Sequence, residues 1–275
     1  MIRNVRYMTK CLGSKCPRCS RCRRLRDIAI AGLLGCILQC TASDGLAYGD
    51  PGRADLTIDH VGFALGYSKG HLQPRWVAYR LTKDRLSSVV SERSQNYFQD
   101  RQCFPGLVAT LDYKSLGCDL GHMAPAGDMK WNAQAEWESF YFSNICPQWP
   151  GFNRGIWKVL EGVVRGFAFS EGRVFVVTGP VLSSKIATRD TQGGRPRIPV
   201  PEYFYKVVFD ETPPKKMIGF VIPHREGMHG VRNYACTVDH VEMLTGLDFF
   251  KELPKEEQNQ LESTFDLKQW TWMIK

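Results

Sequence analysis

Short strand-forming segments joined by short connections constrain the fold of this chain more than any other feature. Segments rich in β-branched and aromatic residues recur along it and are bounded by Gly or Pro, as β-strands typically are. Most connections are too short for a helical crossover, which favours an antiparallel α+β arrangement over alternating βαβ units. The expected strands are residues Val61–Tyr67, Trp76–Leu81, Val174–Thr178, Tyr203–Phe209 and Met217–Ile222.

Helical patterns and turn residues complete the expected organisation of the body. Helices are predicted at residues 133–140, with Asn132 as N-cap, at residues 154–164 and at residues 238–244. A Gly- and Pro-rich stretch over residues 183–201 is typical of a long surface loop. No internal repeat or low-complexity block interrupts this pattern. We therefore expect residues 46–275 to form one catalytic domain.

Positive charge is concentrated at the N-terminus. Nine of the 36 Lys and Arg residues lie within residues 1–26, which contain no acid. The rest of the chain then holds 27 basic and 28 acidic residues, a net charge of −1, although the whole chain carries +8. Net charge therefore does not favour nucleic-acid binding by the folded body, and any phosphate-binding surface must be a local patch.

Residues 1–45 have the composition of a targeting leader. The basic stretch runs into the apolar segment Ile28–Leu38, which is shorter than the roughly 20 residues a membrane-spanning helix needs. Small and polar residues follow, and cleavage after Ala42 fits a signal peptide. We expect export to the periplasm, the envelope or the extracellular space, with a lipid anchor at Cys36 or Cys40 left open. An Arg-rich, acid-poor leader is also compatible with a mitochondrial location.

Cysteine usage adds little to the fold. Six of the ten cysteines lie in the leader, where Cys11, Cys16, Cys19 and Cys22 superficially have the spacing of metal-cluster ligands. No strand or helix pattern frames them, so we interpret this segment as a basic tail. The four cysteines of the body, at positions 103, 118, 146 and 236, permit one or two disulfides but do not make a disulfide scaffold.

A histidine in the middle of the chain is the candidate general base. His122 lies in the segment Asp119-Leu120-Gly121-His122-Met123-Ala124-Pro125, which suggests a turn with an open imidazole. Hydrolysis of a phosphodiester needs a base near neutral pH to deprotonate water, and histidine has an ordinary pKa of about 6.5. A lone histidine is more often structural, so this motif alone decides little.

A second polar group follows about thirty residues later. On a regular helix, Asn153, Trp157, Glu161 and Arg165 lie in one row at i, i+4 spacing. An amide oxygen and a carboxylate suit Mg²⁺, which prefers oxygen ligands and keeps several waters. Asn153 and Glu161 are about 12 Å apart along such an axis, so one direct ligand and one outer-sphere partner is the simpler arrangement. An amphipathic helix with a surface Glu161–Arg165 pair explains the same row without a metal.

Taken together, these segments resemble the ββα-metal family of DNA/RNA non-specific endonucleases, which includes endonuclease G. The resemblance extends from about Val61 to Trp270. Besides the segment around His122, the matching segments within it are residues 76–83, 143–148, 176–180 and 244–250. It implies a ββα-metal nuclease fold, with a central antiparallel sheet flanked by helices. The implied activity is metal-dependent, sequence-non-specific cleavage of DNA and RNA, with Mg²⁺ as cofactor, Mn²⁺ as an alternative, and a homodimer as an open possibility.

The resemblance also implies roles for individual residues. His122 activates water, and Asn153 binds the metal ion that stabilises the leaving 3′ oxygen. Glu161 takes the position that holds a metal-bound water, Arg165 that of a phosphate-facing arginine, and Asp119 opens the catalytic motif. The remaining expected substrate-binding residues are Arg93, Asn144, Gln148 and Arg154.

One position departs from the family pattern. The motif is usually Asp-Arg-Gly-His, and Leu120 replaces its arginine. Leucine cannot supply the charged, bidentate phosphate contact that an arginine makes. A catalytically impaired homologue that binds nucleic acid, or a protein that acts through partner binding or inhibition, is therefore the alternative. Because His122, Asn153 and Glu161 are all present, we expect an active nuclease.

Overall fold

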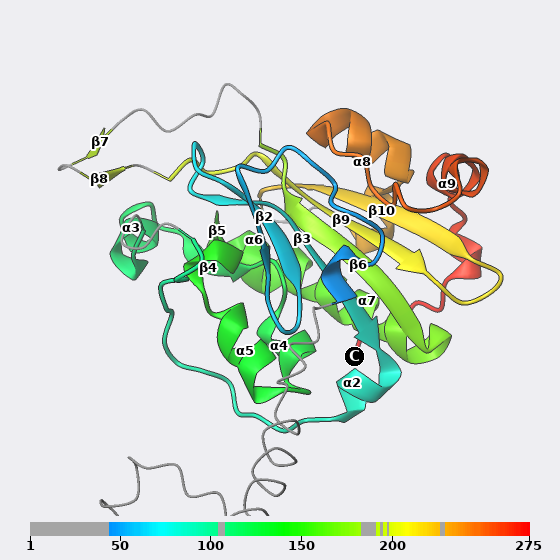
Figure 1. The fold of residues 1–275 in the computed structure, drawn as a ribbon, viewed down its shortest axis with the longest axis horizontal. Helices are drawn as coiled ribbons and strands as arrows, with labels where there is room; N and C mark the ends of the chain where they lie inside the picture. The colour runs from blue at the N-terminus through cyan, green and yellow to red at the C-terminus, as the bar shows by residue number, and fades with distance from the viewer. Residues whose placement is uncertain (1–43, 104–107, 183–190, 193–194, 197, 226–228) are drawn as a thin grey trace, which may run out of the picture. The chain divides into compact units, whose positions relative to one another are not determined.

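The computed structural model describes residues 44–103, 108–182, 191–192, 195–196, 198–225 and 229–275 (Figure 1). The expected leader, including Cys36 and Cys40 and the four spaced cysteines before them, lies outside the described residues except for its last two positions. Of the body cysteines, Cys118, Cys146 and Cys236 form no disulfide in the part of the chain that the structure describes. Within the described part of the chain, no helix is both long and apolar enough to cross a membrane.

A seven-stranded antiparallel sheet forms the centre of the described body. All five expected strands are present, and each is antiparallel to its neighbours, both where a short connection joins them and where a long one, such as residues 83–172, lies between them. Two further strands, β1 and β11, extend the two edges of the sheet. In spatial order the strands are β1 (Leu56–Asp59), β2 (Ala64–Ser68), β3 (Gln73–Thr82), β6 (Arg173–Pro180), β9 (Tyr203–Asp210), β10 (Lys216–Pro223) and β11 (Ala235–Cys236).

Helices cover both faces of this sheet. On one face, α7 (Lys158–Glu171) packs its apolar side against a core that includes Tyr79 and Val208. On the other face, α8 (Val238–Thr245) packs against a second core that includes Phe175 and Phe209. Alternate residues of each strand feed the two cores, as a sheet covered on both sides requires. The expected α+β fold, with a central antiparallel sheet flanked by helices, is confirmed.

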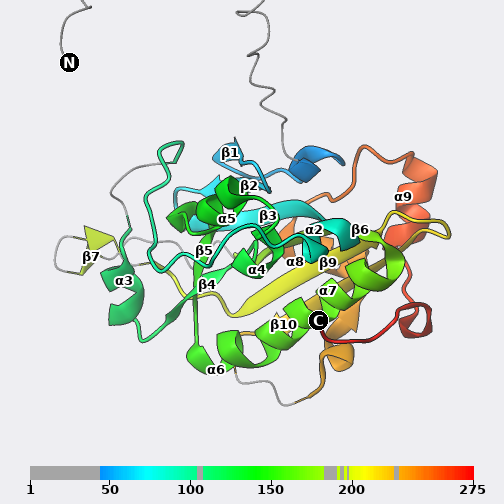
Figure 2. The ribbon, with the colours of Figure 1, turned by 90° about the horizontal axis from the view of Figure 1, so that it is seen from below.

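Shorter elements surround the face that carries α7. Figure 2 shows α6 and α7 lying end to end across this face. A small antiparallel ribbon of β4 and β5 lies beside them, and α4 and α5 fall between its two strands in the chain. The bounds are α2 (Lys83–Ser87), α3 (Thr110–Ser115), β4 (Asp119–His122), α4 (Ala126–Met129), α5 (Ala133–Ser139), β5 (Ile145–Gln148), α6 (Pro150–Phe152) and α9 (Lys255–Glu262).

Two of the three expected helices have the predicted bounds to within a residue. In α5, the Asn132 side chain accepts hydrogen bonds from the backbone of Gln134 and Ala135, which confirms it as the N-cap. The helix expected at residues 154–164 differs. It begins as a wide π turn, η3 (Asn153–Trp157), is kinked at Gly155, and continues as α7 to Glu171. The prediction of a regular i, i+4 row of side chains is therefore wrong between Asn153 and Trp157.

Candidate active site

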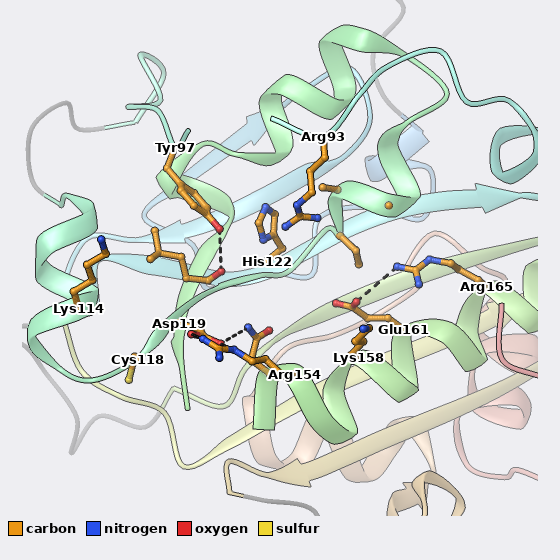
Figure 3. A pocket seen from close by; sticks show the side chains of 15 residues that line it. Arg93, Tyr97, Lys114, Cys118, Asp119, His122, Arg154, Lys158, Glu161 and Arg165 are labelled. Carbon is orange, nitrogen blue, oxygen red and sulfur yellow. Dashed lines mark hydrogen bonds and ion pairs between the residues drawn. The ribbon is translucent and has the colours of Figure 1, made fainter. Parts of the chain in front are cut away.

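A cavity of about 760 Å³ lies between the β4 strand and the start of α7 (Figure 3). Figure 3 shows His122 and Arg93 on one wall, and Arg154 and Glu161 on the opposite, helical wall. The charged and polar groups on these walls are His122, Asn153, the carboxylates of Asp119 and Glu161, and the cations Arg93, Lys114, Arg154, Lys158 and Arg165. The cavity thus combines an imidazole, side chains with oxygen-donor atoms, and positively charged side chains.

The β4–β5 ribbon fixes the backbone on which His122 stands. His122 pairs with Ile145, and Gly121 pairs with Cys146. Gly121 has to be a glycine because a Cβ there would overlap the side chain of Gln148. Beyond His122, the Asn144 side chain accepts from the Ala124 amide and donates to the Ala124 carbonyl, both at 2.9 Å. His122 therefore lies on a held strand, not in the open turn that its glycine and proline neighbours suggested.

The His122 imidazole is buried, with 8% of the residue exposed. Its ring lies 4.8 Å from the ring of Phe140 and 5.6 Å from that of Tyr97, centroid to centroid. Burial, together with the nearby positive charge of Arg93, lowers the pKa of His122 to about 3. The ring is consequently neutral at physiological pH.

One nitrogen of this neutral ring is available to act as a base. The imidazole forms a hydrogen bond with the Leu120 backbone, whereas Nε2 has no hydrogen-bond partner among the described residues. The bond to the Leu120 carbonyl must therefore come from Nδ1–H. A neutral imidazole protonated at Nδ1 carries its lone pair on Nε2. His122 lines the cavity, and its Nε2 is buried there without a hydrogen-bond partner among the described residues.

Asp119 organises the opposite side of the cavity. Its Oδ2 accepts a 3.0 Å hydrogen bond from Asn153 Nδ2, and its two oxygens accept from Arg154 Nε and Nη2 at 2.8 and 2.6 Å. Burial opposes ionisation of Asp119, but the hydrogen bonds from Arg154 and Asn153 hold its pKa below the ordinary value. Because an ionised carboxylate only accepts, the Asn153 amide must turn its nitrogen toward Asp119 and its oxygen away.

Glu161 faces the cavity from α7, after the kink at Gly155. Burial raises the pKa of Glu161 to about 7, although Lys206 and Arg165 act in the opposite direction. Arg165 itself is directed mainly at Asp128, with a 2.6 Å contact from Nε to Oδ1, and lies 3.7 Å from Glu161. Asp128 also accepts a 3.0 Å hydrogen bond from Tyr79. A network of buried charges therefore supports the helical wall.

Arg93 occupies the space near His122. Its guanidinium lies 5.2 Å from the centroid of Phe140, and its charge acts on both His122 and Glu161. Among the described residues no carboxylate forms an ion pair with it. Leu120, which replaces the family's arginine, lines the cavity and packs its side chain on a small apolar cluster with Tyr113. The cation beside the imidazole thus comes from Arg93.

Seven of the nine expected site residues line the cavity: Arg93, Asp119, His122, Asn153, Arg154, Glu161 and Arg165. Asn144 and Gln148 do not line it; both are fully buried behind β4. Asn144 holds the backbone after His122, while the Gln148 side chain packs against Gly121. Asn144 therefore supports the β4–β5 ribbon through its hydrogen bonds, whereas Gln148 Oε1 and Nε2 have no hydrogen-bond partner among the described residues. The structure places neither residue on the cavity wall, where substrate contact was expected.

Four residues of the site are absent from the sequence-based prediction. Tyr97, Lys114 and Lys158 line the cavity, and Asp128 anchors Arg165 behind it. Lys158 directly follows Trp157, a member of the row that starts at Asn153, and Asp128 lies three residues after the Asp119–Pro125 segment, so both are close in sequence to expected site residues. Lys114 reaches the cavity from α3, and Tyr97 from an irregular segment, and neither has a periodic pattern that would indicate it.

The donor set fits a hard divalent cation. With its nitrogen held by Asp119, Asn153 presents an amide oxygen, and Glu161 offers a carboxylate on the same cavity. Carboxylate and amide oxygens are the ligands Mg²⁺ prefers, and a single protein ligand with several waters is a common arrangement for it. Cys118 also lines the cavity, but burial raises the pKa of its thiol to about 11, which disfavours the thiolate that a zinc-type site needs.

Known proteins resemble this chain in sequence and structure. A family model described as DNA/RNA non-specific endonuclease matches residues 41–256. "Nuclease 1, mitochondrial" from Schizosaccharomyces pombe is 30% identical over 243 residues, which cover 82% of this chain and 75% of that protein. The "Mitochondrial nuclease" of Saccharomyces cerevisiae is also 30% identical, over 234 residues covering 78% of this chain and 71% of that protein.

A solved structure shares the fold. A chain in the crystal structure of the EndoG/EndoGI complex, which addresses EndoG inhibition, superposes with a TM-score of 0.67. It is 28% identical in sequence, and the match covers 81% of this chain and 94% of that one. Nucleases of this family depend on a divalent metal. The family match, the relatives and the shared fold agree, and the chain belongs to the DNA/RNA non-specific endonuclease family, as a nuclease that hydrolyses the phosphodiester bonds of nucleic acids.

Proposed function

We propose that the cavity between β4 and α7 is the active site and that His122 is its general base. Nε2 of His122 takes a proton from the attacking water as its oxygen bonds to phosphorus, and the bond from phosphorus to the 3′ oxygen breaks. The observation that carries this proposal is the buried Nε2 of His122, which has no partner among the described residues and belongs to a residue that lines a cavity with oxygen-donor groups and cations.

The low pKa of His122 is compatible with this role. Burial and Arg93 keep the free imidazole unprotonated across the physiological range. A bound phosphodiester brings negative charge that offsets Arg93 and raises the pKa of the imidazole toward neutrality in the complex. The base is then unprotonated before the reaction and able to hold a proton during it.

Asn153 is the proposed protein ligand of the metal ion. Asp119 turns the Asn153 amide so that its oxygen is free to bind a hard cation, and Glu161 faces the same space as a hydrogen-bond acceptor. Mg²⁺ bound there would stabilise negative charge on the leaving 3′ oxygen. Mn²⁺, which accepts similar oxygen ligands, is the expected substitute.

The cations of the cavity are the proposed phosphate-binding groups. Arg93 replaces the positive charge that Leu120 lacks, and Lys114 and Lys158 offer further charge at the cavity walls. Contacts of this kind reach the phosphate backbone, which is the same for every base. We therefore propose cleavage of both DNA and RNA without sequence preference. Asp119 and Arg165 orient the catalytic groups, because each is already engaged by a protein partner.

A binding protein without activity is the second candidate, and Leu120 is the observation that favours it. Digestion of plasmid DNA and of a folded RNA by the full chain, with and without Mg²⁺, separates the two. An active nuclease should cleave both in a metal-dependent manner, and Asn153→Ala should need at least tenfold more Mg²⁺ for half-maximal rate. Retention of nucleic acid without any cleavage would support the binding protein. Equal metal titrations for the parent and Asn153→Ala would place the metal elsewhere.

The leader is proposed to direct the protein to mitochondria. Both relatives carry a mitochondrial location in their names, and the expectation of export, as a secreted or lipid-anchored protein, gains no support from them. A leader that is rich in Arg and lacks acids over residues 1–26 suits this alternative. Residues 1–43 fused to a fluorescent protein should reach mitochondria in a eukaryotic cell. Secretion of that fusion would restore the export hypothesis.

A further inference from the structure

Lys206 is a buried lysine in the middle of the central sheet. It lies on β9, where its register partners are Thr178 on β6 and Phe220 on β10, and none of its surface is exposed. Its neighbours at alternate positions, Phe204 and Val208, belong to the core beneath α7. Because side chains alternate along a strand, Lys206 points to the same face, toward α7 and the underside of the catalytic cavity.

The Lys206 ammonium lacks the partners that a buried charge normally has. Nζ lies 4.8 Å from the ring centroid of Trp157 on η3, and it has no hydrogen-bond partner among the described residues. A buried ammonium is retained only where nearby negative charge or ring electrons compensate its lost hydration. The Trp157 ring compensates part of the lost hydration, and an acid near the ammonium is the other source of compensation.

Charged groups from several elements act electrostatically on this lysine. Asp128 on α4, Glu161 and Arg165 on α7, and Lys206 itself form a set of two acids and two cations. Arg165 is committed to Asp128 at 2.6 Å, and its distance to Glu161 is 3.7 Å. Asp128 has a further partner in Tyr79. Among the described residues neither acid forms a hydrogen bond with Lys206 Nζ. Glu161 lies one helical turn after Trp157, whose ring faces Nζ, and has the weaker ion pair with Arg165, so it is the acid we assign to Lys206.

The electrostatics of the pair agree with this assignment. Burial raises the pKa of Glu161, and Lys206 opposes that rise more strongly than Arg165 does, while Arg93 opposes it less. Burial lowers the pKa of Lys206 to about 8, and Glu161 opposes that fall more strongly than Asp128 does. Each group is thus the main charge partner of the other, across the interface of β9 and α7.

We propose that Lys206 is a positioning residue, whose buried positive charge stabilises the ionised Glu161 carboxylate across the interface of β9 and α7. Lys206 does not line the cavity, so it acts on the reaction only through Glu161. The inference rests on the proposed role of Glu161 in the active site. It adds to that site a residue of the central sheet that does not line the cavity.

A double-mutant cycle in the full chain tests the proposal. Lys206→Met keeps an unbranched, apolar stem and removes the charge, and Glu161→Gln removes the partner charge. We expect Lys206→Met to lower kcat at least tenfold, with KM for a short DNA duplex changed less than threefold. In the Glu161→Gln background, Lys206→Met should change kcat less than twofold, because its only route to the reaction is already lost.

Stability without metal gives a readout that is independent of activity. In EDTA at pH 8, Lys206→Met should lower Tm because Glu161 loses its cation, and the double variant Lys206→Met/Glu161→Gln should regain part of that loss. The double variant also keeps the proposal testable if Lys206→Met alone fails to fold. Lys216→Met is the matched control. Lys216, the first residue of β10, pairs with Asp210 of β9 and Glu171 of α7 and does not line the cavity. Its replacement should change Tm and preserve kcat.

The outcomes separate this inference from the proposed function. If Lys206→Met lowers kcat by the same factor in the parent and in the Glu161→Gln background, Lys206 acts on the fold, and the inference is overturned while the active site stands. If Glu161→Gln alone leaves kcat unchanged, Glu161 has no catalytic role, and both its place in the proposed function and the inference fail. A lower Tm in the double variant than in Lys206→Met would also contradict the pairing.

Discussion

Asn153 Nδ2 donates a 3.0 Å hydrogen bond to Oδ2 of Asp119, and this contact determines which end of the amide faces the cavity. An asparagine alone can present either oxygen or nitrogen, and the two orientations have opposite value for a cation. Asp119 removes that choice. The motif that carries His122 therefore also prepares the proposed metal ligand on the facing helix.

Loss of Asp119 should weaken metal binding without removing a metal ligand. We expect Asp119→Ala to raise the Mg²⁺ concentration for half-maximal activity by about 10- to 100-fold, the usual cost of losing a group that orients a ligand. Arg154→Ala is the control, because it removes the other partner of Asp119 and leaves the Asn153 contact in place. A metal titration with the duplex substrate measures both. Equal shifts for the two variants would mean that the ion pair, not the amide orientation, matters.

Arg93 should supply the charge that Leu120 does not. We expect Arg93→Ala to lower turnover by about 10²-fold, the scale of one lost electrostatic contact to the transition state. Leu120→Arg should raise turnover, and the gain should be larger in the Arg93→Ala background, where the guanidinium has no competitor. Steady-state cleavage of a short duplex at fixed Mg²⁺ and salt gives these rates. No gain in either background, with folded variants, would show that Leu120 is not a defect.

The buried imidazole should also affect stability at acid pH. The folded-state pKa of His122 is about 3, and its ordinary value is 6.5, so between these values the unfolded chain binds a proton that the folded chain does not. Stability therefore falls as pH decreases through this range, by about 2 kcal/mol between pH 7 and pH 5. His122→Gln should remove that loss. Urea unfolding of the metal-free protein at both pH values tests it.

A second buried histidine provides the comparison for this experiment. Burial lowers the pKa of His224 to about 4, and its hydrogen bond with the Pro201 carbonyl opposes the shift. His224→Gln should therefore remove a second part of the decrease in unfolding free energy at acid pH. The effects of His122→Gln and His224→Gln should add, because the two residues share no hydrogen-bond partner. If His122→Gln kept the full pH dependence of the parent, the imidazole would not be buried in neutral form.

The strands of the central sheet could be predicted from the sequence because each combines β-branched and aromatic residues with flanking Gly or Pro. β4 escaped prediction because Asp119-Leu120-Gly121-His122 is short and contains a glycine, and its strand character comes from pairing with β5, a tertiary contact. The environment of His122 was mispredicted for the same reason: the rings that bury it, Tyr97 and Phe140, come from distant segments.

The site was predicted where one motif carries the chemistry and missed where packing decides it. Residue type and spacing alone left His122, Asn153 and Glu161 open to a structural interpretation, and the resemblance to a nuclease family selected them. The kink at Gly155 could not be read from helical periodicity, and it changes how Asn153 lies relative to Glu161. Asn144 and Gln148 look like cavity residues in the sequence, yet both are buried behind β4, where Asn144 holds the backbone after His122. Lys206 lay within a strand pattern, where only the structure reveals its charge partner.

His122 is the residue on which the proposed chemistry depends most. The direct measurement is single-turnover cleavage of a short DNA duplex by the full chain at saturating Mg²⁺, for the parent, His122→Ala and His224→Ala, with circular dichroism to verify folding. His122→Ala should lower the rate by at least 10²-fold, within the range for loss of a general base. His224→Ala, which removes a buried imidazole that supports Trp149, should lower Tm and leave the rate of the folded protein within tenfold. A folded His122→Ala protein that cleaves within tenfold of the parent would contradict His122 as the general base.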